Sequence, residues 1–286
     1  MYIVCAGARI IKKISSCRDV FAVTSVDDEL FMLLALSGRV DFSRLSWLLG
    51  RRDPPDDNQV AVYSISDYKL LRHLNMPGLK LYSNSDMTSC HRYKCLYMSD
   101  CNRKRIHRYD LASGATNKWS VPGTPHGLSV TPSCNLLVIC YEPNKLVELS
   151  ADSGRCVREI ALPSDIVCPW HSVQLTTGES IVCHGVTGLN QVCVVGDDGK
   201  VTRSYGGQRG SKDGPLCCPI HLAVDKDSQF IFLADQGNNR VVLLSPTLEF
   251  VHEVIKGVSW PSRLYLQQAT RRLFVGHQND VTVIQL

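Results

Sequence analysis

The sequence repeats a pattern of four short apolar segments at intervals of about 40 to 50 residues, and this repeat restricts the fold more than any other feature. One clear copy comprises residues 219–225, 230–235, 239–244 and 250–255, with turn-forming residues between successive segments. A second copy follows the same order between residues 125 and 160. Four short strands per unit at this period are typical of a β-propeller blade, not of a helical solenoid.

The number of blades follows from a turn residue that recurs once per unit. Asparagine suits such a turn because it tolerates a left-handed backbone and can bond to the neighbouring backbone. We therefore interpret the recurring residues as structural, and predict one all-β domain over residues 1–286, a six-bladed β-propeller with four-stranded antiparallel blades. The six positions, which are successively 46, 40, 46, 49 and 40 residues apart, are Asn58, Lys104, Asn144, Asn190, Asn239 and Asn279.

The last unit is one strand short, and the missing strand is found near the other end of the sequence. Residues 9–15 resemble a fourth, outer strand and precede the first inner strand at residues 20–23. We expect residues 9–15 to pair with the blade that contains residues 272–276, because closure of the ring removes open sheet edges.

One insertion interrupts the repeat. Residues 37–57 lie where a hairpin turn of a few residues would suffice. Within this segment, residues 41–50 predict a short helix with Asp41 as its N-cap and Gly50 as its terminator. This helix is expected to cover a blade edge or face in blade one, and the alternative is that it docks a partner.

Two copies of the repeat contain a recognisable motif. Residues 234–241 (ADQGNNRV) and 99–106 (SDCNRKRI) are similar to the core of the NHL repeat, so the chain resembles the NHL-repeat β-propeller family. That family includes the C-terminal NHL domains of tripartite-motif ubiquitin ligases, readers of single-stranded RNA and, occasionally, enzymes. No Cys/His ladder of the RING or B-box type precedes the first blade. Any ligase activity is therefore expected to come from a partner or from an upstream region.

Composition restricts the compartment and the partners. The thirteen cysteines are odd in number and irregularly spaced, which favours buried, reduced thiols over a disulfide framework. The net charge of +4 neither requires nor excludes a polyanionic partner. No apolar stretch is long enough to span a membrane. We expect a cytoplasmic protein that does not contact membranes.

Three histidines form the most specific candidate site, because His126, His171 and His221 each lie at the start of an innermost strand. Three imidazoles with an open fourth position can hold a catalytic zinc ion. Residues 125–129 are also similar to the Pro-His zinc-ligand segments of the peptide-amidating lyase, which implies a metal-dependent lyase or hydrolase. The alternative is that the histidines bind the polar groups of a ligand, together with Arg263 near the equivalent place in blade six.

The register of the strands decides between these alternatives. Aligned on the aliphatic residues that follow, His221 is one residue out of step, and a one-residue shift turns a side chain to the opposite face of a strand. We therefore predict that His221 points into its blade, which leaves His126 and His171 as a two-histidine patch. Such a patch cannot hold a catalytic metal alone, so we expect no catalytic residue and no cofactor, with zinc as the alternative.

A basic turn forms the second candidate site. Arg103, Lys104 and Arg105 occupy an exposed turn of the NHL template, and Tyr93 and Tyr109 lie nearby in sequence. Basic and aromatic side chains together can follow a phosphate backbone and stack bases. The alternative is a solvated loop.

These features favour a non-enzymatic binding scaffold that uses the propeller face and the channel mouth. A protein partner, such as a ubiquitin-ligase target, is the first candidate and RNA is the second. The proposed binding residues are His126, His171, His221, Arg263, Arg103, Lys104 and Arg105.

Overall fold

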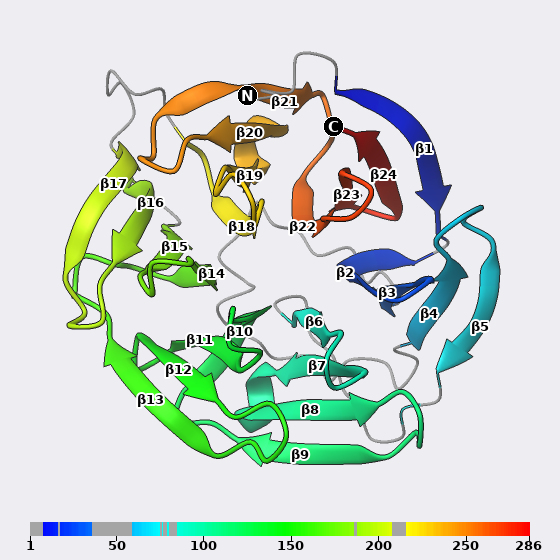
Figure 1. Ribbon diagram of the computed structural model, residues 1–286. Coiled ribbons are helices and arrows are strands. Elements are labelled where there is room, and N and C mark those ends of the chain that lie inside the picture. Colours follow the sequence, from blue (N-terminus) through cyan, green and yellow to red (C-terminus); the bar gives the residue numbers. More distant parts are fainter. Residues whose placement is uncertain are drawn as a thin grey trace.

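Each sequence repeat forms one antiparallel sheet of four strands, and the sheets are arranged radially around a central axis (Figure 1). The computed structural model describes residues 8–16, 18–35, 59–74, 76, 79, 85–185, 188–207 and 216–286. Within these residues there are six such sheets, so the predicted six-bladed β-propeller is confirmed.

The blades follow chain order, and each runs from an innermost to an outermost strand. Blade one contains β2 (Asp19–Val26), β3 (Glu29–Ala35), β4 (Gln59–Ser64) and β5 (Leu70–Leu74). Blade two contains β6 (Met87–Cys90), β7 (Cys95–Asp100), β8 (Arg105–Asp110) and β9 (Thr116–Ser120). Blade three contains β10 (Thr124–Val130), β11 (Leu136–Tyr141), β12 (Lys145–Leu149) and β13 (Cys156–Ala161).

The second half of the ring repeats this order. Blade four contains β14 (Pro169–Gln174), β15 (Ser180–His184), β16 (Asn190–Val195) and β17 (Val201–Gly207). Blade five contains β18 (Pro219–Val224), β19 (Ile231–Asp235), β20 (Arg240–Leu244) and β21 (Phe250–Lys256). Blade six contains β22 (Pro261–Gln267), β23 (Arg272–His277), β24 (Asp280–Gln285) and β1 (Arg9–Ser15).

The ring is closed by its first strand, as predicted. Strand β1 pairs with β24 in an antiparallel register that runs from Arg9 opposite Gln285 to Ser15 opposite Asp280. Ile14 is the buried residue of β1, and Lys13 forms an ion pair of 2.7 Å with Asp280. The outermost strand of blade six is therefore held by backbone bonds, a buried side chain and a charge pair.

Burial on both faces of a sheet explains why the sequences of some strands are continuous runs of apolar residues. The second strand of each blade has sheets on both sides, so β7 and β19 are buried along their whole length. Side chains of neighbouring blades meet in shared clusters, as Tyr97 of blade two does with Leu136 and Val147 of blade three. The outermost strands, such as β5, face solvent and are mostly exposed.

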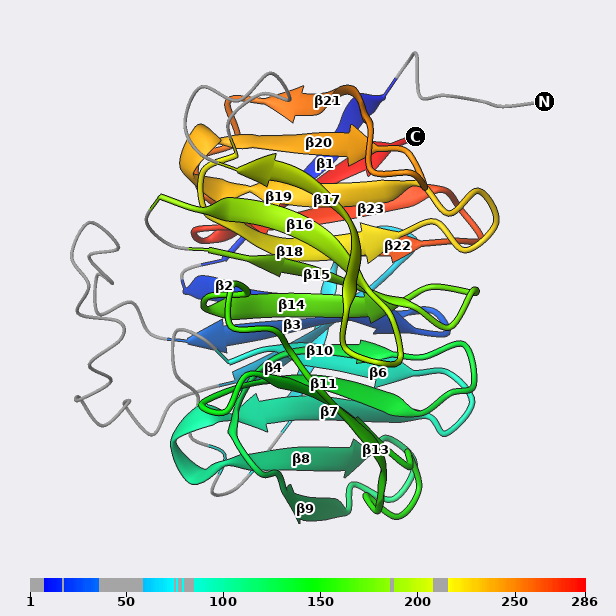
Figure 2. The ribbon, with the colours of Figure 1, turned by 90° about the vertical axis from the view of Figure 1, so that its left-hand side faces the viewer.

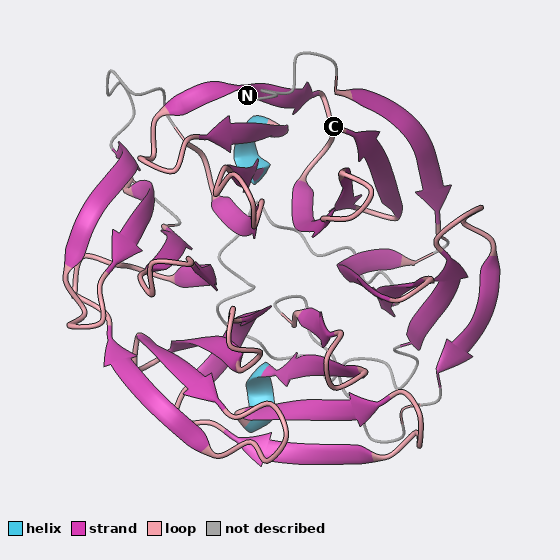
Figure 3. Cartoon of the chain, viewed as in Figure 1, coloured by secondary structure: helices cyan, strands magenta, loops and turns pink. Residues whose placement is uncertain are grey.

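The chain alternates between two faces of the ring. Because the strands are antiparallel, each turn between a second and a third strand lies on the same face as the start of the innermost strand. We call this the strand-start face; it carries Pro169, Pro219 and Pro261 and is on the left in Figure 2. In blades two and five this turn contains a short 3₁₀ helix, η2 (Cys101–Arg103) or η3 (Gln236–Asn238) (Figure 3).

The recurring turn residues hold neighbouring blades together. Lys104 and Asn239 have the predicted left-handed backbone, with φ of 50° and 54°. Three of the asparagine side chains have a further role, because each bonds to the connection that leads into the next blade. The Asn144 amide donates to the Ile166 carbonyl at 2.9 Å. Asn190 Oδ1 accepts from the Cys218 N–H at 3.2 Å, and Asn239 Oδ1 from the Trp260 N–H at 2.9 Å.

The predicted insertion at residues 37–57, with its short helix, lies outside the described residues. Among the residues that the structure does describe, no helix combines the length and the apolar character that a membrane crossing requires.

Candidate functional site

Three innermost strands each aim one side chain at the central channel, and a proline and a β-bulge set the register. Strands β14, β18 and β22 begin with Pro-Trp-His, Pro-Ile-His and Pro-Ser-Arg, and the pairing with the next strand shifts between the proline and the third residue. A bulge re-aims the side chain that follows it. The third residues, which are thereby equivalent, are His171, His221 and Arg263.

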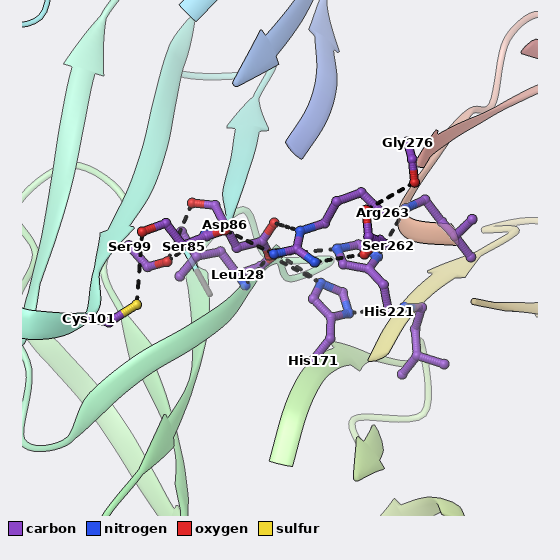
Figure 4. Close-up of polar contacts among 12 residues, drawn as sticks. Ser85, Asp86, Ser99, Cys101, Leu128, His171, His221, Ser262, Arg263 and Gly276 are labelled. Carbon is purple, nitrogen blue, oxygen red and sulfur yellow. Dashed lines mark hydrogen bonds and ion pairs between the residues drawn. The ribbon is translucent and has the colours of Figure 1, made fainter. Parts of the chain in front are cut away.

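These three side chains meet a carboxylate from the other side of the channel (Figure 4). Asp86, just before β6, lies 3.3 Å from Arg263 through Oδ1 and Nε. Its Oδ2 lies 3.7 Å from His221 Nε2 and 3.8 Å from His171 Nε2. The same oxygen accepts a hydrogen bond of 2.9 Å from the Leu128 N–H. We call Asp86, His171, His221 and Arg263 the channel cluster.

The hydrogen bonds assign the tautomer of both imidazoles. Nδ1 of His171 accepts from the Leu222 N–H at 3.4 Å, and Nδ1 of His221 accepts from the Leu264 N–H at 3.3 Å. The proton of each neutral ring is therefore on Nε2. His171 donates this proton to the Leu128 carbonyl at 3.1 Å, and the two rings stack with centroids 3.7 Å apart.

Arg263 is also held by backbone carbonyls. Its two terminal nitrogens donate to the Ser262 carbonyl at 2.7 Å and to the Ser85 carbonyl at 2.9 Å. Arg263 and His221 keep 12% and 10% of their side-chain surface exposed, whereas Asp86 and His171 each keep 3%. A ligand at the channel would therefore meet Arg263 and His221 first.

Burial and charge fix the ionisation of the cluster. Burial alone would raise the pKa of Asp86, but the neighbouring His221 imidazole and the charge of Arg263 outweigh it and hold this pKa well below its usual value. Burial lowers the pKa of His171 to about 3 and also lowers that of His221. At neutral pH the cluster is thus an ion pair between Asp86 and Arg263 flanked by two neutral imidazoles.

The cluster also contains the donor types of a metal site. One donor atom each from Asp86, His171 and His221 lies within 4.8 Å of the others. A metal ion would have to displace the Nε2 protons and sit close to the guanidinium of Arg263, which already neutralises the carboxylate. The donor set therefore fits an internal ion pair better than a divalent cation.

The structure corrects the prediction for His221 and, with it, the predicted patch of His126 and His171. His221 points to the channel beside His171, and His126 is the histidine that turns away. His126 stacks between Tyr141 and Trp170, at centroid distances of 5.7 and 5.3 Å, and its Nδ1 is 3.1 Å from the Pro169 carbonyl. The predicted register failed because it was aligned on aliphatic residues, whereas the proline and the bulge set the position. In blade three the equivalent third residue is Gly127.

Two residues of the site were missed by the sequence reasoning. Gly127 is needed because a Cβ there would lie 2.6 Å from the ring of His171 and 2.5 Å from the Trp170 carbonyl. Asp86 was missed because no proline marks the start of the inner strand in blade two. Asp86 and His221 each lie 14 residues before the aspartate of the repeat motif, Asp100 or Asp235, so an alignment on that motif would have matched Asp86 with His221.

The basic turn lies on the strand-start face. Arg103, Lys104 and Arg105 are exposed, and Arg103 is tied to the buried carboxylate of Asp100 at 3.3 Å. Tyr93 belongs to the hairpin at the other end of β7 and packs against the core, and Tyr109 is buried. The predicted run of interleaved basic and aromatic side chains is therefore not formed.

The fold and the channel cluster define a six-bladed β-propeller with a buried ion pair at its axis. No family model matches the chain, and no curated protein matches it significantly in sequence. Solved structures share the fold: a catalytically inactive variant of virginiamycin B lyase from Staphylococcus aureus with quinupristin has a TM-score of 0.63 and 12% identity over 95% of this chain and 82% of that chain.

Two further structures are similar. A streptogramin B lyase structure has a TM-score of 0.64 and 8% identity, covering 97% of both chains. A protein of unknown function from Bacteroides caccae has a TM-score of 0.57 and 15% identity over 76% of this chain and 78% of that chain. At these identities the likeness concerns the fold alone.

Proposed function

We propose that this propeller is a non-enzymatic scaffold whose strand-start face binds a protein partner through an acidic segment with apolar side chains. The resemblance of residues 99–106 and 234–241 to NHL repeats supports this class of function. A target of a ubiquitin ligase, with the ligase activity supplied by another chain, is the partner that the resemblance favours.

The observation that carries the proposal is a contrast on the strand-start face between buried polar groups at the channel and exposed cationic and apolar side chains around it. The polar groups of the channel cluster are bonded to one another and to the backbone, whereas Lys104 and Arg105 are exposed on the same face. Two apolar side chains in the connections to inner strands are also exposed, Val167 at 49% and Trp260 at 39%. Exposed cations and exposed apolar side chains on one face suit an acidic peptide with apolar anchors.

RNA is the weaker candidate because of where the aromatic side chains lie. Single-stranded RNA requires stacking platforms next to the cations. Tyr93 is at the opposite end of β7 from Arg103, and Arg92 already lies over the Tyr93 ring at 5.6 Å.

Changing Lys104 and Arg105 to serine together is expected to weaken binding to the best acidic peptide of a fixed-length peptide array by about 5- to 30-fold, because each exposed charge contributes up to roughly 1 kcal/mol. Arg103 is left in place because it bonds to Asp100. The matched control changes Lys69 and Lys200, exposed cations in turns between third and fourth strands, and should leave the affinity unchanged. Affinities are measured by fluorescence anisotropy. Binding of a uridine 20-mer RNA without any peptide binding would overturn the protein assignment.

The lyase or hydrolase alternative would depend on metal binding by the channel cluster. We expect the dialysed chain to take up far less than one zinc ion in a calorimetric titration, because Arg263 already neutralises Asp86 and both Nδ1 atoms accept backbone hydrogen bonds. Stoichiometric zinc binding that is lost in both His171→Ala and His221→Ala, but kept in His126→Ala, would contradict the scaffold and support the enzyme.

A further inference from the structure

Two adjacent cysteines occupy an unusual position just before the inner strand of blade five. Cys217 and Cys218 are both half-buried residues. Most of the other cysteines in the described residues are buried, namely Cys90, Cys95, Cys101, Cys140, Cys168, Cys183 and Cys193. Among the described cysteines, only this pair is adjacent in sequence, and both of its members reach the surface.

The backbone of the pair is fixed by its neighbours. The Cys217 N–H donates to Asp235 Oδ1 at 2.7 Å and the Cys218 N–H to Asn190 Oδ1 at 3.2 Å. The Cys217 carbonyl accepts from the Gly237 N–H at 2.8 Å, and the Cys218 carbonyl accepts from the Gln236 N–H at 3.2 Å. Two thiols on a backbone held at four points are preorganised as a pair.

The surroundings make room for the sulfur of Cys217. A Cβ on Gly237 would lie 2.4 Å from Cys217 Sγ, so the absence of a side chain at this glycine leaves space for the thiol. Burial first, and then the neighbouring Cys217 thiol and the Asp235 charge, raise the pKa of Cys218 to about 11. The Cys218 thiol is therefore a neutral S–H group at neutral pH, which favours chemistry that ends without a net charge.

We propose that Cys217 and Cys218 form a bidentate site for trivalent, thiophilic metalloids of the arsenic(III) class. An aryl arsonous acid reacts with two thiols by breaking two S–H and two As–OH bonds. Two As–S bonds form, two water molecules leave, and arsenic remains trivalent. This site is independent of the proposed partner-binding function.

A bridge through one atom suits this pair better than a disulfide. The Cα atoms of adjacent residues are about 3.8 Å apart across a trans peptide, whereas disulfides usually need about 4.4 to 6.8 Å. A metalloid between the sulfurs removes this restriction, because the two thiols no longer have to bond to each other.

The test uses phenylarsine oxide with the intact, reduced chain. Intact-mass spectrometry is expected to show one adduct per chain, which an excess of a small 1,2-dithiol reverses. Cys217→Ser and Cys218→Ser should each weaken binding by about 100-fold or more, because the second As–S bond is no longer intramolecular. Cys156→Ser is the matched control, since Cys156 is exposed and has no adjacent cysteine; it should bind as the parent chain does.

The outcomes are separable from folding defects. Thermal melting identifies variants that do not fold, and Cys217→Ala and Cys218→Ala provide a second pair in case a serine variant fails. Unchanged binding in a folded single variant would overturn the site. Full binding by the Cys217→Ser/Cys218→Ser double variant would also overturn it, and would point to a buried pair such as Cys90 and Cys95, which lie opposite each other in blade two.

Discussion

Replacing Asp86 with asparagine is expected to lower the free energy of unfolding by about 3 to 5 kcal/mol, because it leaves the buried guanidinium of Arg263 without its counter-charge. The amide also turns an NH₂ donor toward groups that need an acceptor. His221 Nε2 and Arg263 Nε both carry protons, and one oxygen of the asparagine can satisfy only part of this demand. Denaturant unfolding at pH 7 measures the change.

Two companion variants show whether the ion pair is the cause. Asp198→Asn removes an exposed carboxylate paired with Lys200, and no measurable change is expected. The double variant Asp86→Asn/Arg263→Met should be more stable than the sum of the single changes implies, because the unpaired buried charge has been removed. An Asp86→Asn protein as stable as the parent chain would refute the ion pair as a stabilising element.

Acid is expected to destabilise the propeller strongly between pH 6.5 and about 4, well before most carboxylates are protonated. Burial lowers the pKa of His126 to about 4 and that of His171 to about 3, whereas an unfolded histidine titrates near 6.5. Below pH 6.5 the unfolded chain therefore binds more protons than the folded one, so stability falls with pH. Each ring accounts for a loss on the order of 3 kcal/mol at pH 4.

The pH range in which the histidines lower stability is distinct from the range in which protonation of Asp86 lowers it. The folded pKa of Asp86 is depressed, so its contribution is complete above the unfolded value near 3.9 and is lost only at lower pH. The measurement is the denaturant midpoint as a function of pH. His126→Phe keeps an aromatic ring between Tyr141 and Trp170 and should reduce the slope between pH 6.5 and 4. A flat profile for the parent chain in this range would show that these histidines are not buried as neutral rings.

The fold was predictable because it depends on patterns that repeat. The period of the strands gave the number of blades, and the surplus strand at residues 9–15 fitted the deficit in the last blade. The turn residues were only partly predictable. Lys104 and Asn239 adopt the expected left-handed backbone, but the bonds from Asn144 and Asn190 to the next blade depend on the curvature of the ring, which a local pattern does not encode.

The site was less predictable because it depends on single-residue register and on contacts across the ring. The equivalence of Arg263 to the channel histidines could be seen in the sequence. The orientation of His221 could not, since a bulge after the proline reverses the side that simple alternation predicts. Asp86 lies two blades from His171 and three from His221 along the chain, and only the closed ring brings them within 4 Å.

The pairing of β1 with β24 also determines when the protein can complete its fold during synthesis. Arg9 lies opposite Gln285, so the ribosome must add about 270 residues after β1 before its partner strand exists. At roughly 5 to 20 residues per second this takes on the order of 15 to 50 s. Throughout that time the nascent chain has unpaired edges at both β1 and the newest blade. The ring, and with it the buried contact between blades two and six, therefore forms only after β24 has been synthesised.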